Sequence, residues 1–259
     1  METLTLLFVG TAGLIFGSFF NVVIYRLPHG LNLSRPPSAC PGCGARIKPY
    51  DNVPVLSYLI LRGRCRKCGQ RISLVYPLVE ALTALGFVLV YLNAGRQLSL
   101  AFFAGCLFTS ALIVLGFIDY LDGNIYYIIA VPGLILALVD SFFRNDLTFP
   151  LALIGAAFGA GFLLLFYSIW RYVLKREGLG LGDVILMLMV GAFLGWQRTF
   201  LTLLLASLVG SFIGIFLILR RGKNFQSSLP FGVFIAPAAF AAMLWGEWIL
   251  RRLGWSSLL

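Results

Sequence analysis

Two aspartates stand out among the ionisable side chains that lie in or beside apolar stretches of this chain. Asp119 ends one such stretch, and Asp183 follows Gly180 and Gly182 and begins another. Ionisable residues within membrane-spanning helices are costly and usually functional. Two neighbouring carboxylates share one proton, so that one activates water while the other protonates a carbonyl oxygen or a leaving group. The pair predicts aspartic-protease chemistry, which needs neither metal nor histidine; a helix N-cap is the structural alternative for Asp183.

The other acids outside the cysteine-rich segment and the single histidine have structural interpretations. Asp122 begins an Asp-Gly-Asn sequence that is typical of a turn, and a turn is also the structural alternative for Asp119. Asp140 and Glu247 fall near the predicted outer ends of apolar helices, where we expect interfacial side chains. His29 lies in a Pro-His-Gly turn, where we expect a solvated side chain. Its isolation also argues against a catalytic metal site built from several histidines.

Four of the five cysteines form two CxxC pairs that are separated by 21 residues, namely Cys40 with Cys43 and Cys65 with Cys68. Two such knuckles suit tetrahedral coordination of zinc by thiolates. The alternatives are two disulfides, which a reducing cytoplasm disfavours, or a redox pair. Four protein ligands leave no open position, so we interpret the site as structural Zn²⁺ that holds a small domain together. Cys106 lies in an apolar run, where we expect a small buried hydrophobic residue.

The composition restricts the elements that can position these residues. The chain is 60% hydrophobic and 12% charged, whereas a soluble domain is about 25% charged. These values exclude a soluble enzyme and a disordered protein, and they argue against an outer-membrane barrel. Apolar runs of membrane-spanning length predict an all-α polytopic membrane protein. The runs are 4–25, 77–94, 99–118, 125–143, 149–171, 182–197, 199–219 and 231–249.

We therefore expect about eight transmembrane helices. Seven is the alternative, because the run at 182–197 is short and the break after it depends on Gln197 and Arg198. No basic residue precedes Arg26, so the first run is interpreted as a retained helix and not as a signal peptide. The predicted division is a first helix at 1–26, a zinc-knuckle domain at 27–76, and a seven-helix membrane domain at 77–259.

The distribution of basic residues predicts the orientation. A net charge of +10 could indicate nucleic-acid binding, but basic loops beside membrane helices explain it better, and we expect no nucleic-acid partner. Most of the 20 Lys and Arg residues lie in 26–76 and near 171–180 and 220–230. Eight spans place these three segments on one side. The positive-inside rule then puts the cysteine domain and both aspartates on the cytoplasmic side, with both termini outside.

Five motifs together resemble those of the type IV prepilin peptidases, the bifunctional leader peptidase and N-methyltransferase enzymes of bacterial inner membranes. A first-helix signature, two CxxC pairs and a segment that enters the second helix are followed by a GxGD motif and a last-helix motif. Besides the cysteines, the matching segments are Gly17–Pro28, Tyr76–Glu80, Gly178–Asp183 and Pro230–Gly232. The resemblance covers nearly the whole chain.

The resemblance implies an eight-helix GxGD aspartyl protease in which Asp119 and Asp183 are the catalytic pair. It implies that the substrates are type IV prepilins or the pseudopilins of type II secretion, cleaved after the terminal glycine of a short basic leader. It also implies N-methylation of the new N-terminus with S-adenosylmethionine as the methyl donor. Glu80 has two open interpretations: it stabilises the start of the second helix, or it serves the methyl-transfer or substrate site.

Two positions depart from the family pattern. The family commonly has Ile/Leu-Pro-Asp after the first aspartate, whereas here Tyr126 and Tyr127 follow Ile125, and Ile185 replaces a lysine after the second aspartate. These changes predict an altered activity or substrate set, so a zinc-domain membrane adaptor with an altered catalytic site stays as an alternative. A proton-coupled transporter is another, and it predicts acids at mid-membrane instead of at the cytoplasmic edge.

Overall fold

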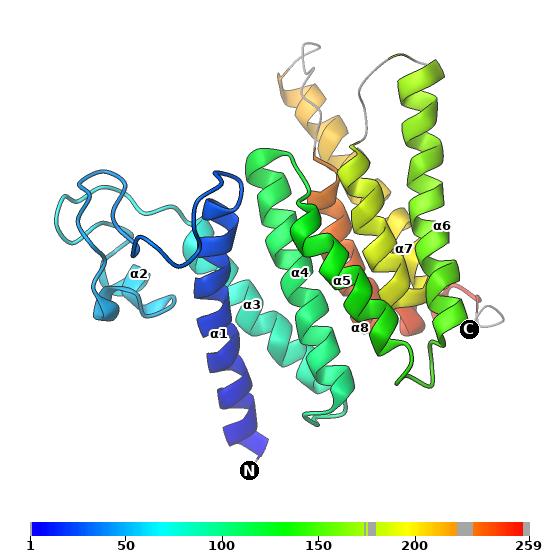
Figure 1. Ribbon diagram of the computed structural model, residues 1–259, viewed down its shortest axis with the longest axis horizontal. Coiled ribbons are helices and arrows are strands. Elements are labelled where there is room, and N and C mark those ends of the chain that lie inside the picture. The colour runs from blue at the N-terminus through cyan, green and yellow to red at the C-terminus, as the bar shows by residue number, and fades with distance from the viewer. Residues whose placement is uncertain (1, 174, 176–179, 222–229, 256–259) are drawn as a thin grey trace. The chain divides into compact units, whose positions relative to one another are not determined.

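The computed structural model describes residues 2–173, 175, 180–221 and 230–255. Throughout these residues the chain is helical, apart from loops and two isolated β-bridges. It divides into two compact units, Met1–Phe102 and Phe103–Leu259 (Figure 1). The Gly178 end of the GxGD motif and much of the two later basic loops lie outside the described residues.

Unit 1 pairs two apolar helices around the cysteine-rich segment. Its elements are α1 (Glu2–Arg26), η1 (Pro49–Asp51), α2 (Leu56–Ile60) and α3 (Val75–Asn93). α1 packs on α3 through glycines: a Cβ on Gly13 would lie 2.6 Å from the Ala84 Cα, and a Cβ on Gly17 would lie 2.6 Å from the Glu80 Cα. Small residues four apart allow this close approach of membrane helices.

Unit 2 is a bundle of apolar helices. Its elements are α4 (Leu100–Asp122), which begins in unit 1, α5 (Tyr127–Asp140), α6 (Phe149–Ser168), η2 (Ile169–Val173), α7 (Leu181–Arg221) and α8 (Gly232–Arg252). Among the described residues of both units, six helices are long and apolar enough to cross a membrane, and α5 is a shorter apolar helix. The prediction of an all-α polytopic membrane protein is confirmed.

α7 is interrupted at Gly195, where the backbone takes φ 74° and ψ 167°. The two arms of α7 correspond to the runs predicted at 182–197 and 199–219. Figure 1 shows that both ends of α7 reach the same end of unit 2, with the bend at the opposite end. The break lies just before the predicted one at Gln197, because glycine adopts a positive φ without a Cβ clash.

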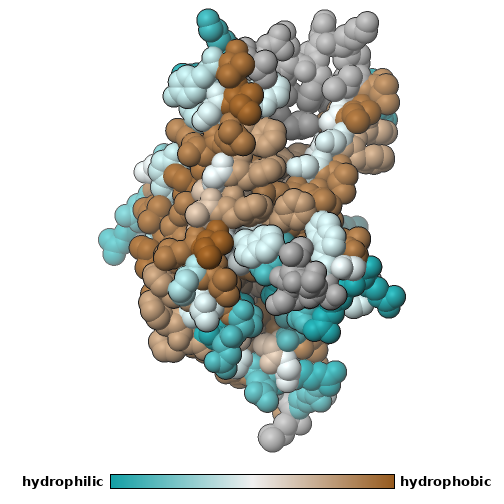
Figure 2. All heavy atoms as spheres, turned by 90° about the vertical axis from the view of Figure 1, so that its right-hand side faces the viewer, coloured by the Kyte–Doolittle hydropathy of each residue, from teal (hydrophilic) through white to brown (hydrophobic). Residues whose placement is uncertain are grey.

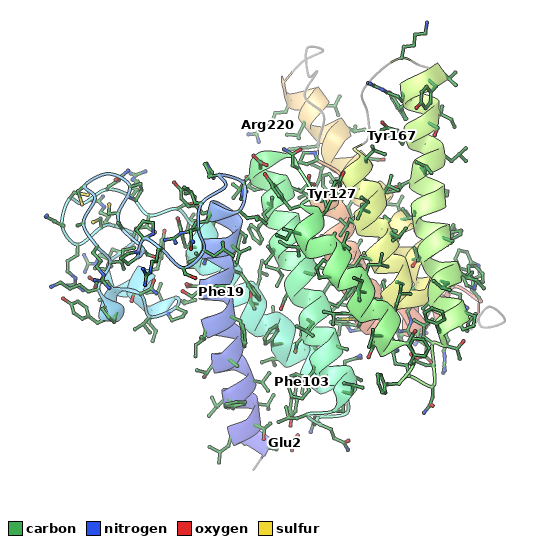
Figure 3. All side chains as sticks on the ribbon, in the orientation of Figure 1. Glu2, Phe19, Phe103, Tyr127, Tyr167 and Arg220 are labelled. Carbon is green, nitrogen blue, oxygen red and sulfur yellow. The ribbon has the colours of Figure 1, made fainter. Side chains whose placement is uncertain are left out.

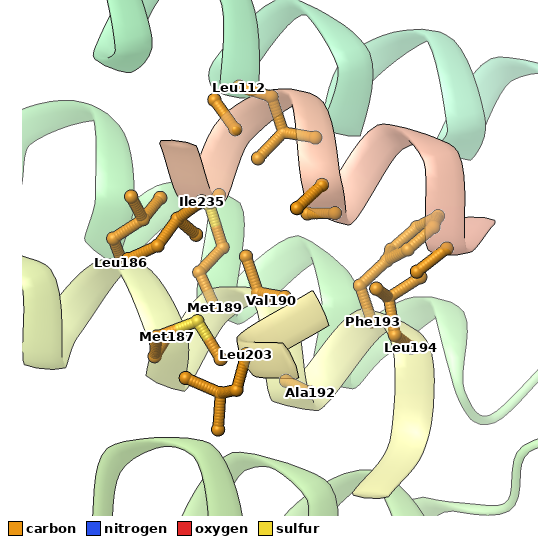
Figure 4. Packing of buried hydrophobic residues seen from close by; sticks show 14 of the residues in the cluster. Leu112, Leu186, Met187, Met189, Val190, Ala192, Phe193, Leu194, Leu203 and Ile235 are labelled. Carbon is orange, nitrogen blue, oxygen red and sulfur yellow. The ribbon is translucent and has the colours of Figure 1, made fainter. Parts of the chain in front are cut away.

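The first arm of α7 lies at the centre of the apolar core of unit 2. Figure 4 shows Leu186, Met189 and Val190 of this arm beside Leu112 of α4 and Ile235 of α8. On one face of the molecule, hydrophobic side chains cover a broad middle region, and hydrophilic ones gather mostly toward the lower end (Figure 2). Such an apolar exterior is what lipid contact requires.

α6 meets α7 backbone to backbone. A Cβ added to Gly155 would lie 2.3 Å from the Gly191 carbonyl oxygen, and one added to Gly191 would lie 2.1 Å from the Gly155 carbonyl oxygen. A Cβ added to Gly159 would lie 2.7 Å from the Met187 carbonyl oxygen. This contact holds the arm of α7 that carries Asp183.

Arg144 lies at the bend of α7. Its guanidinium donates to the Asp146 carboxylate at 2.7 Å and to the Phe193 carbonyl oxygen at 2.9 Å, and it lies 3.5 Å from the Asp140 carboxylate. Asp140, expected to be interfacial, is therefore buried against an arginine at the end of α5. Glu247 is half-exposed and pairs with Arg251.

Candidate active site and metal site

Asp119 and Asp183 meet at one end of unit 2. Asp119 lies in the last turn of α4 and Asp183 lies in the first turn of α7. Both are buried, with 3% and 6% of their surface exposed. The Asp119 carboxylate lies close enough to interact electrostatically with that of Asp183. Helix packing thus brings together two acids that are 64 residues apart in the sequence. Both acids lie near helix ends and not at mid-helix.

The first turn of α8 supplies hydrogen-bond donors to this pair. The Val233 N–H donates to Asp119 Oδ2 at 3.0 Å. The Gly232 N–H lies within reach of both carboxylates. These N–H groups have no acceptor within their own helix, and the positive end of the helix dipole favours a negative charge there. The Pro-Phe-Gly motif therefore contributes backbone N–H groups to the site.

Ile125 packs between the segments that carry Gly182 and Gly232, beside Asp119. A Cβ on Gly182 would lie 2.6 Å from the Ile125 Cβ, and one on Gly232 would lie 3.0 Å from the Ile125 Cδ1 and 2.7 Å from Asp119 Oδ2. Both glycines are thus required for close approach. Sequence reasoning identified the motif glycines but missed Ile125, because a single isoleucine after a turn carries no signal of a role between two distant motifs.

The two oxygens of Asp183 have different surroundings. Oδ2 accepts the Gly180 N–H at 3.2 Å, the bond expected when an acidic side chain in the first turn reaches back to cap its helix. Among the described residues, Asp183 Oδ1 is the buried side-chain oxygen that has no hydrogen-bond partner. The helix-cap alternative and a chemical role are therefore compatible, since one oxygen caps the helix and the other is free to react.

The two family departures flank this pair without replacing it. The Tyr126 hydroxyl donates to Asp122 Oδ2 at 3.1 Å, and the Asn124 amide donates to the same oxygen at 3.1 Å. This bonding closes the exposed turn expected at Asp122. Ile185 packs against the apolar core of unit 2.

The four CxxC cysteines come together in unit 1. All of the Sγ atoms of Cys40, Cys43, Cys65 and Cys68 lie within 4.8 Å of one another, and those of Cys40 and Cys68 are 3.8 Å apart. Tetrahedral zinc with Zn–S bonds of about 2.3 Å requires sulfurs about 3.8 Å apart, whereas a disulfide requires about 2.05 Å. None of these four cysteines forms a disulfide. The arrangement can hold a metal ion.

Each knuckle is built by the same local hydrogen bonds. The Cys40 N–H donates to the Ala45 carbonyl and the Gly44 N–H donates back to the Cys40 carbonyl, both at 2.9 Å. Cys65, Gly69 and Gln70 repeat this pattern in the second knuckle. Backbone N–H groups of Cys68 and Lys67 also lower the pKa of the Cys65 thiol to about 6, which favours the thiolate that binds metals.

Glu80 links α3 to the cysteine-rich segment. Its Oε2 accepts the Val55 N–H at 2.7 Å, at a residue with φ 60°. The Asn21 side chain donates to the Tyr76 carbonyl at 3.0 Å. The first-helix signature and the Tyr76–Glu80 segment therefore form one packed interface, which gives the structural interpretation of Glu80 a physical basis.

The remaining sequence expectations concern His29 and Cys106. His29 is exposed, bonds the Tyr25 carbonyl at 2.7 Å and stacks on the Tyr25 ring with centroids 4.9 Å apart. Cys106 is buried in α4.

Two family models match the chain in these same regions. Residues 11–94 match the Bacterial Peptidase A24 N-terminal domain, and residues 106–215 match the Type IV leader peptidase family. The second match contains both aspartates, and the first contains the four clustered cysteines. A comparison with solved structures finds no match.

Curated relatives match over most of the chain, and each of the following is named prepilin leader peptidase/N-methyltransferase. The Pseudomonas putida protein is 38% identical over 91% of this chain and 88% of its own length. The Pseudomonas aeruginosa protein is 37% identical over 92% of this chain and 90% of its own length. The Myxococcus xanthus protein is 41% identical over 83% of this chain and 64% of its own length. This chain belongs to the type IV leader peptidase family.

Proposed function

We propose that this chain is a membrane aspartic endopeptidase that removes the short leader from type IV prepilins or type II secretion pseudopilins. The observation that carries the proposal is the meeting of Asp119 and Asp183 at the N-terminus of α8. The names of the relatives support the substrate class. Because both acids lie near helix ends, the geometry favours a peptidase over a proton-coupled transporter with acids at mid-membrane.

The hydrogen bonds suggest a role for each carboxylate. Asp119 accepts the Val233 N–H of α8, so we propose it as the base. Asp183, which has a free Oδ1, carries the shared proton. Water attacks the scissile carbonyl carbon and loses a proton to Asp119, while Asp183 protonates the carbonyl oxygen.

Collapse of this tetrahedral intermediate completes the cleavage. Asp119 passes its proton to the leaving amine as the C–N bond breaks, and a hydroxyl proton of the intermediate returns to Asp183. The pair is then restored to its starting protonation state, and no metal or covalent intermediate takes part in these steps.

A second activity follows from the names of the relatives, which include N-methyltransferase. We propose that the new N-terminal amine released by cleavage is methylated, with S-adenosylmethionine as the co-substrate. Prepilin and bilayer lipid are then the partners of the chain.

The cysteine cluster is proposed as a structural zinc site. Cys40, Cys43, Cys65 and Cys68 would supply four thiolates, and zinc bound there would crosslink two knuckles that have little apolar core of their own. The positive-inside rule supports placing the 27–76 domain and both aspartates on the cytoplasmic face of the bacterial inner membrane, with the seven-helix part at 77–259 as the protease domain.

Cleavage of a model prepilin by the purified chain in liposomes tests the proposal. Asp119→Asn and Asp183→Asn should each reduce cleavage by about 10³-fold or more, because each removes a proton-transfer group. Asp122→Asn, one turn away and exposed, is the matched control and should retain cleavage. Mass spectrometry of the product reports cleavage and the methyl increment together. Full cleavage by either active-site variant would refute the assignment.

A further inference from the structure

The cysteine-rich segment of unit 1 presents an apolar face that its own fold does not cover. The short helix α2 exposes Leu56, Leu59 and Ile60, with 56%, 64% and 73% of their surfaces accessible. We call these three residues the α2 face. Exposing three neighbouring large aliphatic side chains to water costs free energy. We therefore expect another apolar surface to cover this face.

The orientation of the α2 face is fixed by hydrogen bonds of Ser57, the buried residue of this helix. Ser57 is buried, its hydroxyl donates to the Tyr50 carbonyl at 3.1 Å, and it accepts the Val53 N–H at 2.9 Å. Because these bonds fix which side of α2 turns inward, the exposure of the leucines and isoleucine is a built feature of the fold.

Charge identifies the kind of partner. Between residues 27 and 76, Asp51 is the single acidic residue, and it is paired with Arg66 at 2.6 Å. The exposed Arg62 and Arg64 follow directly after α2. A partner that suits both the α2 face and this flank must offer an apolar layer next to negative charge, which an anionic lipid bilayer does at its interface.

α2 lies in the same compact unit as a helix that can cross the membrane. α1 is a candidate membrane span. Figure 1 shows the cysteine-rich segment, α2 included, beside the C-terminal half of α1, the half on which Figure 3 labels Phe19. A segment beside the end of a membrane-spanning helix lies close to the lipid headgroups.

We propose that the α2 face inserts into the interface of an anionic membrane, with Arg62 and Arg64 on lipid phosphates. The long arginine side chains keep their charges at the headgroups while the aliphatic side chains enter the acyl region. The cysteine-rich segment would then be anchored by α1, by α3 and by this third contact, which orients it against the membrane surface.

Site-specific photocrosslinking of the full chain in nanodiscs tests this proposal without using cleavage as a readout. p-Benzoylphenylalanine replaces Ile60, and the matched control carries it at the exposed Lys67 of the second knuckle. In discs of phosphatidylglycerol and phosphatidylcholine, we expect lipid adducts at position 60 and few at position 67. Equal lipid adducts at both positions would overturn the proposal.

A second comparison tests whether the charges of Arg62 and Arg64 contribute to lipid binding. Arg62→Gln with Arg64→Gln, or discs of phosphatidylcholine alone, should each lower the lipid adducts at position 60 by about fivefold or more. An unchanged elution volume in size-exclusion chromatography verifies that the variant is folded. Adducts at position 60 to the chain itself or to an added prepilin, absence of any adduct, or yields that do not depend on lipid charge would each overturn the proposal.

Discussion

The cysteine cluster of unit 1 and the carboxylate pair of unit 2 are assembled in opposite ways. Each half of the cysteine cluster is a six-residue turn closed by its own backbone hydrogen bonds, and only the joining of the two halves is long-range. Neither half of the carboxylate pair is a short turn that brings the two acids together by itself. It needs the end of α4, the start of α7 and the start of α8 at one place.

This contrast predicts different sensitivities. A locally built site tolerates shifts of distant elements, because its ligands are set by the turns that carry them. A site assembled from helix ends depends on every contact that sets helix spacing, such as Gly232 against Asp119 or Gly155 against Gly191. Since catalysis can lose about 10²-fold for a displacement of about 1 Å, packing residues without any chemistry of their own should control cleavage.

Gly232→Ala provides the largest effect outside the carboxylates themselves. Its Cβ would lie 2.7 Å from Asp119 Oδ2 and 3.0 Å from Ile125, so Asp119 must move. We expect cleavage to fall by about 10²-fold while the metal content of the cysteine cluster stays unchanged. Kinetics on a model prepilin and metal analysis measure the two sites separately.

The control for this substitution is Gly161→Ala in α6, where an added Cβ meets nothing within 4 Å. It should cleave like the parent chain. Wild-type cleavage by Gly232→Ala would contradict the dependence of the carboxylate pair on the close approach of α8.

Metal removal should have the opposite pattern to Gly232→Ala, with a large effect on the cysteine cluster and a small effect on cleavage. Chelation, or Cys43→Ser together with Cys65→Ser, should release about one zinc per chain and open the two knuckles, because the ligands supply much of the folding energy of such a small domain. Cleavage should fall by less than about tenfold, because the described residues that donate to the carboxylates belong to unit 2. Metal analysis and amide exchange of residues 38–72 are the measurements.

Cys106→Ser is the control for the cysteine changes, since Cys106 lies outside the cluster; it should retain the metal. A protein that contains no zinc and carries two disulfides would refute the metal site. A loss of cleavage as large as that of Asp183→Asn would show that the two sites are coupled.

Glu80→Ala has a smaller, local effect within unit 1. It leaves the Val55 N–H without its acceptor, at a cost of about 1–3 kcal/mol if that group stays buried. We expect faster amide exchange over residues 53–63, with little change in the exchange of α7. Glu80→Gln keeps an acceptor oxygen and should restore much of the protection; if it loses methylation while the amides stay protected, Glu80 has a role in methyl transfer.

Tyr126→Phe has the smallest expected effect. It removes the hydroxyl bond to Asp122 in an exposed turn, and such bonds contribute about 0.5–1.5 kcal/mol. Cleavage should change by less than about threefold, because the Asn124 amide still bonds Asp122. A loss comparable to that of Gly232→Ala would mean that the Tyr126 turn positions Asp119 or the substrate.

Much of the fold was predictable because hydropathy is a local property. Each predicted apolar run corresponds to a helix or to one arm of α7, and the CxxC spacing predicted a cluster that the structure brings together. The bend of α7 lies slightly before the predicted break, at Gly195. Gln197 and Arg198 were the polar signal, but backbone conformation changes where glycine permits a positive φ, at Gly195.

The sequence by itself predicted the helical membrane class, the clustering of the four cysteines and the pairing of Asp119 with Asp183. Only the tertiary structure decided that the start of α8 donates to Asp119, that Ile125 spaces two glycine motifs, and that Glu80 holds Val55. The reason is physical. Hydropathy and turn spacing act between residues close in the chain, whereas these contacts depend on how closely helices pack, which glycines far apart in sequence set together.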